Sequence, residues 1–157
     1  MERFPAGRVR RVPQKHAVAP QGAASSGMPS PSHHPAHVLG RFGEAQAHCL
    51  LVRRGWRILA RNYRFGRREI DLVIRWDDLV AFVEVKTRAG AGYGAPEEAI
   101  TRLKRREIEL VAQEFLVRHR LGEVDVRFDV VAIVVGSGLR VIRIDHLEDA
   151  WRPEPLC

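Results

Sequence analysis

The sequence lacks any long hydrophobic run, and it contains little cysteine. Its purest apolar stretch, Val130 to Val135, is only strand-sized, whereas a membrane-spanning helix needs roughly 20 apolar residues. A membrane span is therefore excluded, and no membrane partner is expected. The two cysteines, Cys49 and Cys157, have a spacing that suits neither a zinc site nor a disulfide framework. The N-terminus also lacks the apolar core of a secretion signal, so we expect a reducing, cytoplasmic setting.

Large apolar residues are scarce in the first 38 residues, which hold six of the nine prolines and four of the five serines. A segment of that composition cannot bury enough surface to offset the entropy lost on ordering. We therefore predict a disordered basic tail over residues 1–38, one α/β domain over 39–153 and a short C-terminal tail over 154–157. A true start near Met28 and an organelle transit peptide both stay open. The domain is long enough for one modest core and too short for a two-domain enzyme.

Acidic residues are absent between Ala45 and Arg68. The whole chain carries a net charge of +7, and the tail supplies more than half of it, so the domain itself is only mildly basic. An acid-free arginine patch suits a polyanion such as nucleic acid. Arginines that only cover a solvent-exposed face and bind no partner would produce the same sequence pattern. The seven arginines of this stretch are Arg53, Arg54, Arg57, Arg61, Arg64, Arg67 and Arg68.

Hydrophobic periodicity predicts an alternation of helices and strands. A helix is expected over residues 40–54, because Phe42, Ala45, Cys49 and Val52 recur at helical spacing and Gly55 follows as a terminator. Strands are expected over 56–65, 69–76, 79–87, 127–135 and 139–144, a long helix from Pro96 to about His119, and a short helix over 146–151. The order α-β-β-β-α-β-β-α predicts a two- or three-layer α/β domain with a mixed sheet of about five strands flanked by helices.

Charged side chains within the most apolar strands are the main candidates for chemistry. Glu84 follows the run Leu-Val-Ala-Phe-Val in a strand that looks buried on both faces, and an unpaired carboxylate there would cost several kcal/mol. A neighbouring strand can bring Asp71 beside Glu84. A divalent cation is the usual way to keep two close carboxylates ionised, and oxygen ligands favour Mg²⁺ or Mn²⁺.

Lysine is rare in this sequence, which has three lysines among 26 basic residues. Lys86, two residues after Glu84, therefore suggests a position where a compact ammonium group is needed. A purely structural ion pair of Lys86 with Glu84 or Asp71 would leave the same pattern, so the residues alone do not decide between catalysis and structure.

At this point the residues resemble a known group of proteins. Asp71, followed by Glu84-Val85-Lys86, resembles the signature of the PD-(D/E)xK nuclease superfamily. The wider string is more specific: Gly40-Arg41-Phe42-Gly43-Glu44, Ile58 to Arg64, Glu69-Ile70-Asp71-Leu72, Phe82 to Arg88 and Arg127 to Val131. It is similar to the YraN-like family of small bacterial proteins, which have a nuclease-like fold related in appearance to archaeal Holliday-junction resolvases. The resemblance spans residues 40–151.

The resemblance implies a restriction-endonuclease-like core and a metal-dependent endonuclease that acts on DNA, branched or single-stranded. Asp71 and Glu84 would bind Mg²⁺ or Mn²⁺, Lys86 would position the attacking water, and Glu44 would complete the catalytic site. Glu44 in a helix first turn is also favoured by the helix dipole alone. Glu69 would support the metal ligands. A DNA backbone would be held by Arg61, Arg64, Arg67, Arg68, Arg88, Lys104, Arg105 and Arg106.

Some features leave alternatives open. The family pattern has Gln after the helix lysine, where this chain has Arg105, and Gly before Glu-Ile-Asp, where it has Arg68. A non-catalytic nucleic-acid-binding module that keeps the nuclease fold is the alternative function, because a fold does not establish an activity. Asp129 matches the family, but a structural hydrogen-bonding role is favoured. Tyr93, in a glycine-rich loop, would be available to stack on a base. A homodimer would suit a junction-cleaving role.

Overall fold

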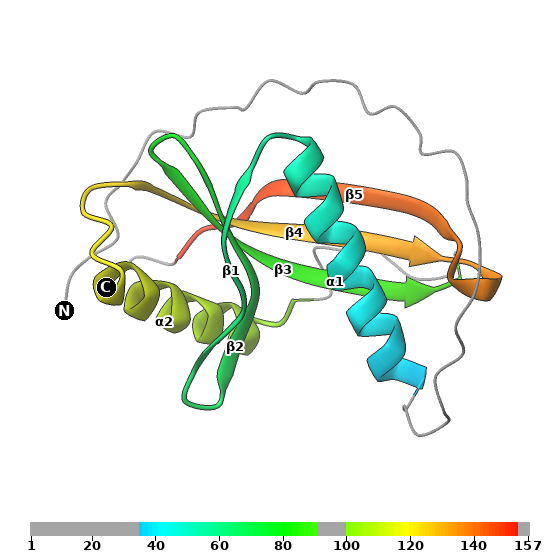
Figure 1. The fold of residues 1–157 in the computed structure, drawn as a ribbon. Helices are drawn as coiled ribbons and strands as arrows, with labels where there is room; N and C mark the ends of the chain where they lie inside the picture. Colours follow the sequence, from blue (N-terminus) through cyan, green and yellow to red (C-terminus); the bar gives the residue numbers. More distant parts are fainter. Residues whose placement is uncertain (1–34, 91–99, 154–157) are drawn as a thin grey trace.

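The computed structural model describes residues 35–90 and 100–153 (Figure 1). Predictions for residues 1–34, Tyr93, Pro96 and residues 154–157 lie outside this part of the chain. Neither helix of the described part has the length and apolar character needed to cross a membrane. The elements are α1 (Pro35–Arg53), β1 (Arg57–Phe65), β2 (Arg68–Trp76), β3 (Leu79–Ala89), α2 (Arg102–Arg118), β4 (Asp125–Val135), the 3₁₀ turn η2 (Ser137–Leu139) and β5 (Val141–Trp151).

The five strands form one mixed sheet in the order β1-β2-β3-β4-β5. The β3–β4 pair is parallel, because α2 crosses between the two strands in the chain, and the other three pairs are antiparallel. The predicted mixed five-stranded sheet is therefore confirmed. β3 and β4 lie at its centre, and their near-continuous apolar runs fit strands that are covered on both faces.

Two hydrophobic cores lie on opposite faces of the sheet, because neighbouring residues of β3 alternate between them. Val80 and Phe82 belong to the α2-side core, which includes Phe115 of α2. Ala81 and Val83 belong to the α1-side core, which includes Leu51 of α1. The domain therefore has three layers, with one helix packed against each face of the sheet (Figure 1).

The first helix differs from the prediction in its start and in its buried face. It begins at Pro35 instead of residue 40 and so includes residues that the composition assigned to the tail. Cys49 and Val52 are exposed, whereas Ala47 and Leu51 are fully buried. Of the predicted stripe, Phe42 is half-buried against the α1-side core, whereas Ala45, Cys49 and Val52 face outward. The prediction missed part of the buried face, because the small residues Gly43 and Ala47 let that side of the helix approach the sheet closely.

The second half of the chain contains two further differences. α2 begins at Arg102, where the Thr101 side chain caps the helix by accepting a hydrogen bond from the Lys104 N–H at 3.2 Å. The predicted short helix over residues 146–151 is wrong, because β5 continues through Trp151 and pairs with β4 along its length. The final element of the predicted order is therefore a strand, and the last helix does not exist.

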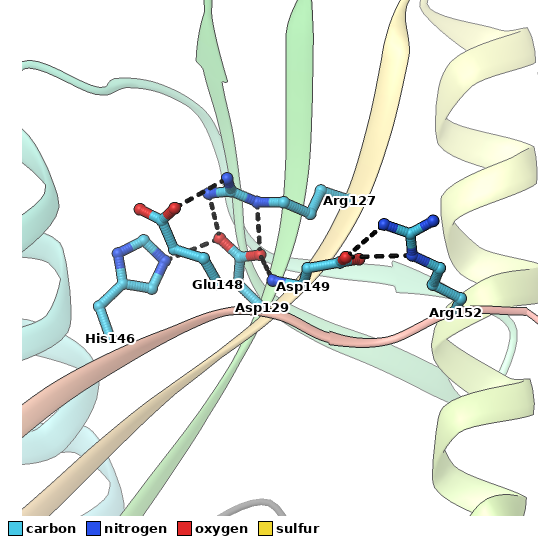
Figure 2. A network of polar contacts seen from close by, with 6 residues as sticks. All are labelled: Arg127, Asp129, His146, Glu148, Asp149 and Arg152. Carbon is cyan, nitrogen blue, oxygen red and sulfur yellow. Dashed lines mark hydrogen bonds and ion pairs between the residues drawn. The ribbon is translucent and has the colours of Figure 1, made fainter. Parts of the chain in front are cut away.

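A buried polar network holds β5 onto β4 (Figure 2). Asp129 is fully buried and accepts hydrogen bonds from Arg127 at 2.8 Å, from His146 at 2.7 Å and from the Asp149 N–H at 3.0 Å. Phe128 pairs with Trp151 and Val130 with Leu147, so β5 carries a bulge here, and Asp149 has a φ of 54°. At this bulge the regular hydrogen bonding between β4 and β5 is interrupted, and the Asp129 carboxylate accepts the hydrogen bond of the Asp149 N–H instead.

The same contacts set the charge state of Asp129. Burial alone would raise its pKa, but hydrogen bonds from His146 and Arg127 outweigh burial and lower it. Since an ionised carboxylate only accepts hydrogen bonds, His146 must carry its proton on Nε2. The structure therefore gives Asp129 the structural hydrogen-bonding role that the sequence favoured.

Candidate active site

The candidate site lies where β2 and β3 separate, a place we call the β2–β3 fork. The paired residues of these strands run from Trp76 opposite Leu79 to Leu72 opposite Val83, and Asp71 is the next residue of β2. Its carboxylate Oδ2 accepts a hydrogen bond of 2.7 Å from the Val85 backbone N–H. The side chain thus replaces a main-chain partner at the end of the ladder, and this contact places it next to Glu84.

Glu84 lies in β3 on the same face as Val80 and Phe82, and its side chain is 4% exposed. Two lysines neutralise it. Lys86 Nζ donates to Oε1 at 2.8 Å, and Lys104 Nζ, from α2, lies 3.5 Å from Oε2. Lys104 also donates to the Glu69 carbonyl oxygen at 3.2 Å, which ties α2 to β2 beside the fork. A buried glutamate is thus held between two partly exposed ammonium groups.

Glu44 reaches the fork from α1. Its Oε2 accepts a hydrogen bond of 2.9 Å from the Asn62 side chain, and its negative charge contributes to the electrostatics of Asp71. Asn62 adopts a φ of 47°, a left-handed conformation that asparagine tolerates better than most residues. The structure therefore links Asp71 electrostatically to Glu44 and Glu84, and Glu84 in turn to Lys86.

The carboxyl group of Asp71 is strongly perturbed. Its pKa is raised to about 7, mainly by burial and then by the negative charges of Glu84 and Glu44, while the Val85 hydrogen bond and Lys104 act in the opposite direction. Two carboxylates that repel each other at a partly buried point bind protons or cations readily. Perturbed groups of this kind gather at functional sites, although structural ion networks can produce them too.

The residues at the fork fit a small oxygen-preferring cation. Within residues 35–90 and 100–153, no group of three His, Cys, Asp or Glu side chains is close enough to form a complete metal cage. Mg²⁺ does not need one, because it commonly keeps several waters and takes one or two protein carboxylates. Glu84 Oε2 is buried and accepts no hydrogen bond from the described residues, although Lys104 Nζ lies 3.5 Å away, so it could also accept a cation. The donor set therefore suits Mg²⁺ or Mn²⁺ and does not suit zinc.

The other predicted site residues have mixed surroundings. Glu69 directs its carboxylate to Arg64 at 2.8 Å and reaches the fork only through its carbonyl oxygen. Arg105 donates to the Ile100 carbonyl and lies over the Trp151 ring at 5.8 Å, so it packs back onto the domain. Residues that are exposed or half-buried on the surface are Arg61, Arg67, Arg68, Arg88 and Arg106.

Sequence reasoning missed three features of the site. It assigned Lys104 to backbone binding, whereas the structure places this lysine on Glu84. It gave no role to Asn62, although an asparagine in the middle of a strand was a usable signal for a special backbone conformation. It also overlooked Gly43, where an added Cβ would lie 1.6 Å from Thr87 Oγ1. Gly43 thus lets α1 approach β3 closely enough to present the adjacent Glu44.

Comparison with known protein families gives a match that spans the residues of the fork. The model of the family described as "Uncharacterised protein family UPF0102" matches residues 43–133, which include Glu44, Asp71, Glu84 and Lys86. The chain belongs to the UPF0102 family. UPF0102 is the YraN family of the PD-(D/E)xK nuclease-like superfamily, so the resemblance seen in the sequence is confirmed.

Several UPF0102 proteins are similar over almost their full length. The UPF0102 protein of Chloroherpeton thalassium is 44% identical over 124 residues, covering 75% of this chain and 96% of the relative. That of Prosthecochloris aestuarii is 43% identical over 122 residues, with the same coverage. That of Rhodococcus opacus is 45% identical over 114 residues, covering 73% of this chain and 96% of the relative.

The raised pKa of Asp71 predicts that this UPF0102 protein loses stability as the pH rises. The unfolded carboxyl ionises near 3.8, whereas the folded one keeps its proton up to about pH 7. Between these values the folded state binds more protons, so the free energy of unfolding decreases with rising pH. Asp71→Asn should remove this decrease, which is on the order of 2 kcal/mol between about pH 5 and pH 8.

Urea denaturation in the presence of a chelator at both pH values measures this effect. The change in the wild type–variant difference with pH reports the titration of Asp71 together with its interaction with the charges of Glu84 and Glu44. A wild type–variant difference that is the same at both pH values would mean that the Asp71 carboxyl has an ordinary pKa.

The close contact at Gly43 predicts a position-specific effect of alanine. Gly43→Ala should destabilise the UPF0102 domain by about 2 kcal/mol, because Thr87 and the helix must move apart. Gly40→Ala is the matched control in the same helix, since its added Cβ meets nothing within 4 Å. That change should stabilise the helix by up to about 1 kcal/mol. Thermal denaturation of both variants checks the pair, and equal effects would contradict the contact.

Proposed function

We propose that this protein is a metal-dependent endonuclease that hydrolyses phosphodiester bonds in DNA. The observation that carries the proposal is the meeting of Asp71 and Glu84 at the β2–β3 fork, where the charge of Glu84 helps raise the pKa of Asp71. Lys86 and Lys104 bracket the same carboxylate. Two clustered carboxylates with an adjacent lysine form a group that can hold a cation and act on a phosphate.

The proposed chemistry divides between the cation and the residues of the chain. Mg²⁺ or Mn²⁺ held by Asp71 and Glu84 would lower the pKa of a bound water and polarise the scissile phosphate. Lys86, which is 32% exposed, can turn its ammonium group from Glu84 toward a phosphate oxygen or the attacking water. Glu44 is fixed by Asn62 at 2.9 Å, so it is placed to accept a hydrogen bond from water at the edge of the site.

DNA is favoured as the substrate class by resemblance and by charge. Arg61, Arg67 and Arg106 are exposed, and such arginines can contact phosphates without reading sequence. The form of DNA that we propose, branched or single-stranded, rests on the resemblance to junction-resolving nucleases alone.

Labelled DNA of several forms tests the proposal. Linear duplex, nicked, single-stranded and four-way DNA are incubated with the protein and Mg²⁺, Mn²⁺ or a chelator. We expect cleavage of at least one form that requires the metal and is lost in Lys86→Ala. Cleavage that persists in the chelator, or that Lys86→Ala retains in full, would contradict the proposed site.

The alternative function is a nucleic-acid-binding module without turnover. It is favoured by one observation: Glu84 already has Lys86 at 2.8 Å and Lys104 at 3.5 Å, so its charge is compensated without a cation. The same incubation separates the two functions. A binding module would retain DNA at low salt, where phosphate contacts are strongest, and would leave every form uncut with either metal.

A further inference from the structure

A second surface feature lies at the other end of β2 from Asp71. Here the chain forms an open hollow of about 480 Å³, which we call the Trp76 hollow. Arg75 is the fourth residue after Asp71, which corresponds to roughly 13 Å along a strand, so the hollow is separate from the β2–β3 fork. Its lining residues are Gly55, Arg57, Arg75, Trp76 and Asp77.

The two arginines of the hollow are placed against each other. Arg57 of β1 and Arg75 of β2 are direct partners across the antiparallel strands, and like charges at such positions destabilise a sheet. Arg75 Nε donates to the Asp77 carbonyl oxygen at 2.7 Å. No ion pair with a carboxylate is formed by either arginine within the described residues. An anion bound between the two guanidinium groups would relieve the repulsion.

Trp76 provides a fixed aromatic surface beside this pair. Its side chain is held by Trp56, with ring centroids 6.0 Å apart in an edge-on arrangement, and by Gly55. A Cβ on Gly55 would lie 2.7 Å from the Trp76 ring, and Gly55 has a φ of 90°, so glycine is required there on both counts. Trp76 nevertheless remains 38% exposed. An indole that is held in place by its neighbours and partly exposed to solvent is suited to stacking on a planar partner.

Exposed arginines connect the hollow with the fork. Arg57, Arg61 and Arg64 lie along β1, the edge strand of the sheet, and all three are exposed. Arg61 is paired with Leu72, the neighbour of Asp71, so β1 runs from the hollow to the level of the candidate active site. Because β1 is an edge strand, an extended polyanion can follow it without displacing either helix.

We propose that the Trp76 hollow binds an unpaired nucleotide of the DNA strand, with the base stacked on Trp76 and the flanking phosphates on Arg57 and Arg75. The proposal rests on the proposed function in taking DNA as the ligand. It adds a substrate requirement: a single-stranded segment on the Trp76 side of the cleaved bond. A base in an intact duplex is already stacked on its neighbours and cannot occupy the hollow.

Tryptophan fluorescence tests this site directly. Trp56 and Trp151 are 3% and 6% exposed, so Trp76 is the tryptophan whose fluorescence a dissolved ligand can quench by contact. Single-stranded oligothymidylate, added with a chelator, should quench wild-type fluorescence, and blunt duplex of equal length should quench it less. Trp76→Phe should lose the quenching and bind within a few-fold of wild type. Trp76→Ala should bind about 5- to 100-fold more weakly, as expected for one lost stacking contact.

A matched pair of arginine variants tests the phosphate contacts. Arg57→Ala should lower the salt dependence of oligonucleotide binding by about 0.7 in the log–log slope, the value for one phosphate of a single strand. Arg140→Ala, at an exposed position beyond η2, should leave the slope unchanged. Far-ultraviolet circular dichroism confirms that each variant is folded before binding is measured.

Three results would overturn the proposal. They are oligonucleotide binding without quenching, equal affinity of wild type and Trp76→Ala, and binding of free thymidine monophosphate as tight as that of the oligonucleotide. Cleavage assays on the same preparations separate this site from the proposed function. If the protein cleaves DNA without fluorescence quenching, the nucleotide site at the Trp76 hollow is contradicted and the proposed function is supported. If it binds the oligonucleotide with quenching but never cleaves DNA, the nucleotide site is supported and the proposed function is contradicted.

Discussion

Glu84→Gln should reduce metal-dependent DNA cleavage by about 10³-fold, equivalent to roughly 4 kcal/mol of transition-state stabilisation. The change keeps the size of the side chain but removes the charge that would hold the cation. It also leaves Lys86 and Lys104 without their buried counter-charge. DNA affinity in a chelator should stay equal or increase, because one negative charge is removed beside the proposed phosphate position. Single-turnover cleavage and equilibrium binding measure the two quantities separately.

Glu69→Gln is the matched control for that variant. Glu69 lies two residues before Asp71 in β2, but its carboxylate pairs with the exposed Arg64 and its contact with Lys104 uses the main-chain oxygen. We expect less than a tenfold change in cleavage, because an exposed ion pair contributes little. If Glu69→Gln were as damaging as Glu84→Gln, the cation would have to be held by a different set of carboxylates.

Arg127→Met should lower the free energy of unfolding by about 3–5 kcal/mol. The variant leaves the fully buried Asp129 without its arginine partner and removes the contact of Arg127 with Glu148 (Figure 2). It also removes the cation held 5.4 Å from the Trp56 ring. For a domain of this size the loss corresponds to a melting temperature lower by roughly 10–20 °C, which differential scanning calorimetry resolves.

Arg152→Met is the control for the buried network. Arg152 donates to Asp149 at 2.7 Å, but its side chain is 66% exposed, so the loss should be small compared with that of Arg127→Met. The double variant Arg127→Met, Asp129→Leu should recover much of the stability lost in Arg127→Met, since it also removes the unpaired buried carboxylate of Asp129. No recovery would mean that Arg127 stabilises the fold mainly through Trp56 and Glu148.

The strands of the sheet could be predicted from the sequence where apolar residues are continuous, as in β3 and β4. The end of β5 could not. Leu147, Ala150 and Trp151 have helical spacing, and only the bulge at Asp149, created by contacts with Asp129, lets them lie in a strand. The buried face of α1 was also hard to see, because Gly43 and Ala47, which lie on it together with Leu51, carry almost no hydrophobic signal.

The members of the candidate site were easier to predict than their contacts. Asp71, Glu84 and Lys86 stood out because charged residues in apolar strands require a reason. The role of Lys104 was not visible, since it depends on how α2 packs beside β2. The hollow at Trp76 likewise depends on cross-strand register and on the conformation of Gly55, neither of which is encoded locally.

The central claim is that Asp71 and Glu84 together hold one divalent cation. Electron paramagnetic resonance of free Mn²⁺, titrated with protein and a non-hydrolysable single-stranded DNA analogue, measures that binding directly. We predict that wild type removes one equivalent of Mn²⁺ from solution and that Asp71→Asn and Glu84→Gln each weaken this binding at least about tenfold, the lower end for a lost metal contact. Equal Mn²⁺ binding by wild type and both variants, or no binding by wild type, would contradict the claim.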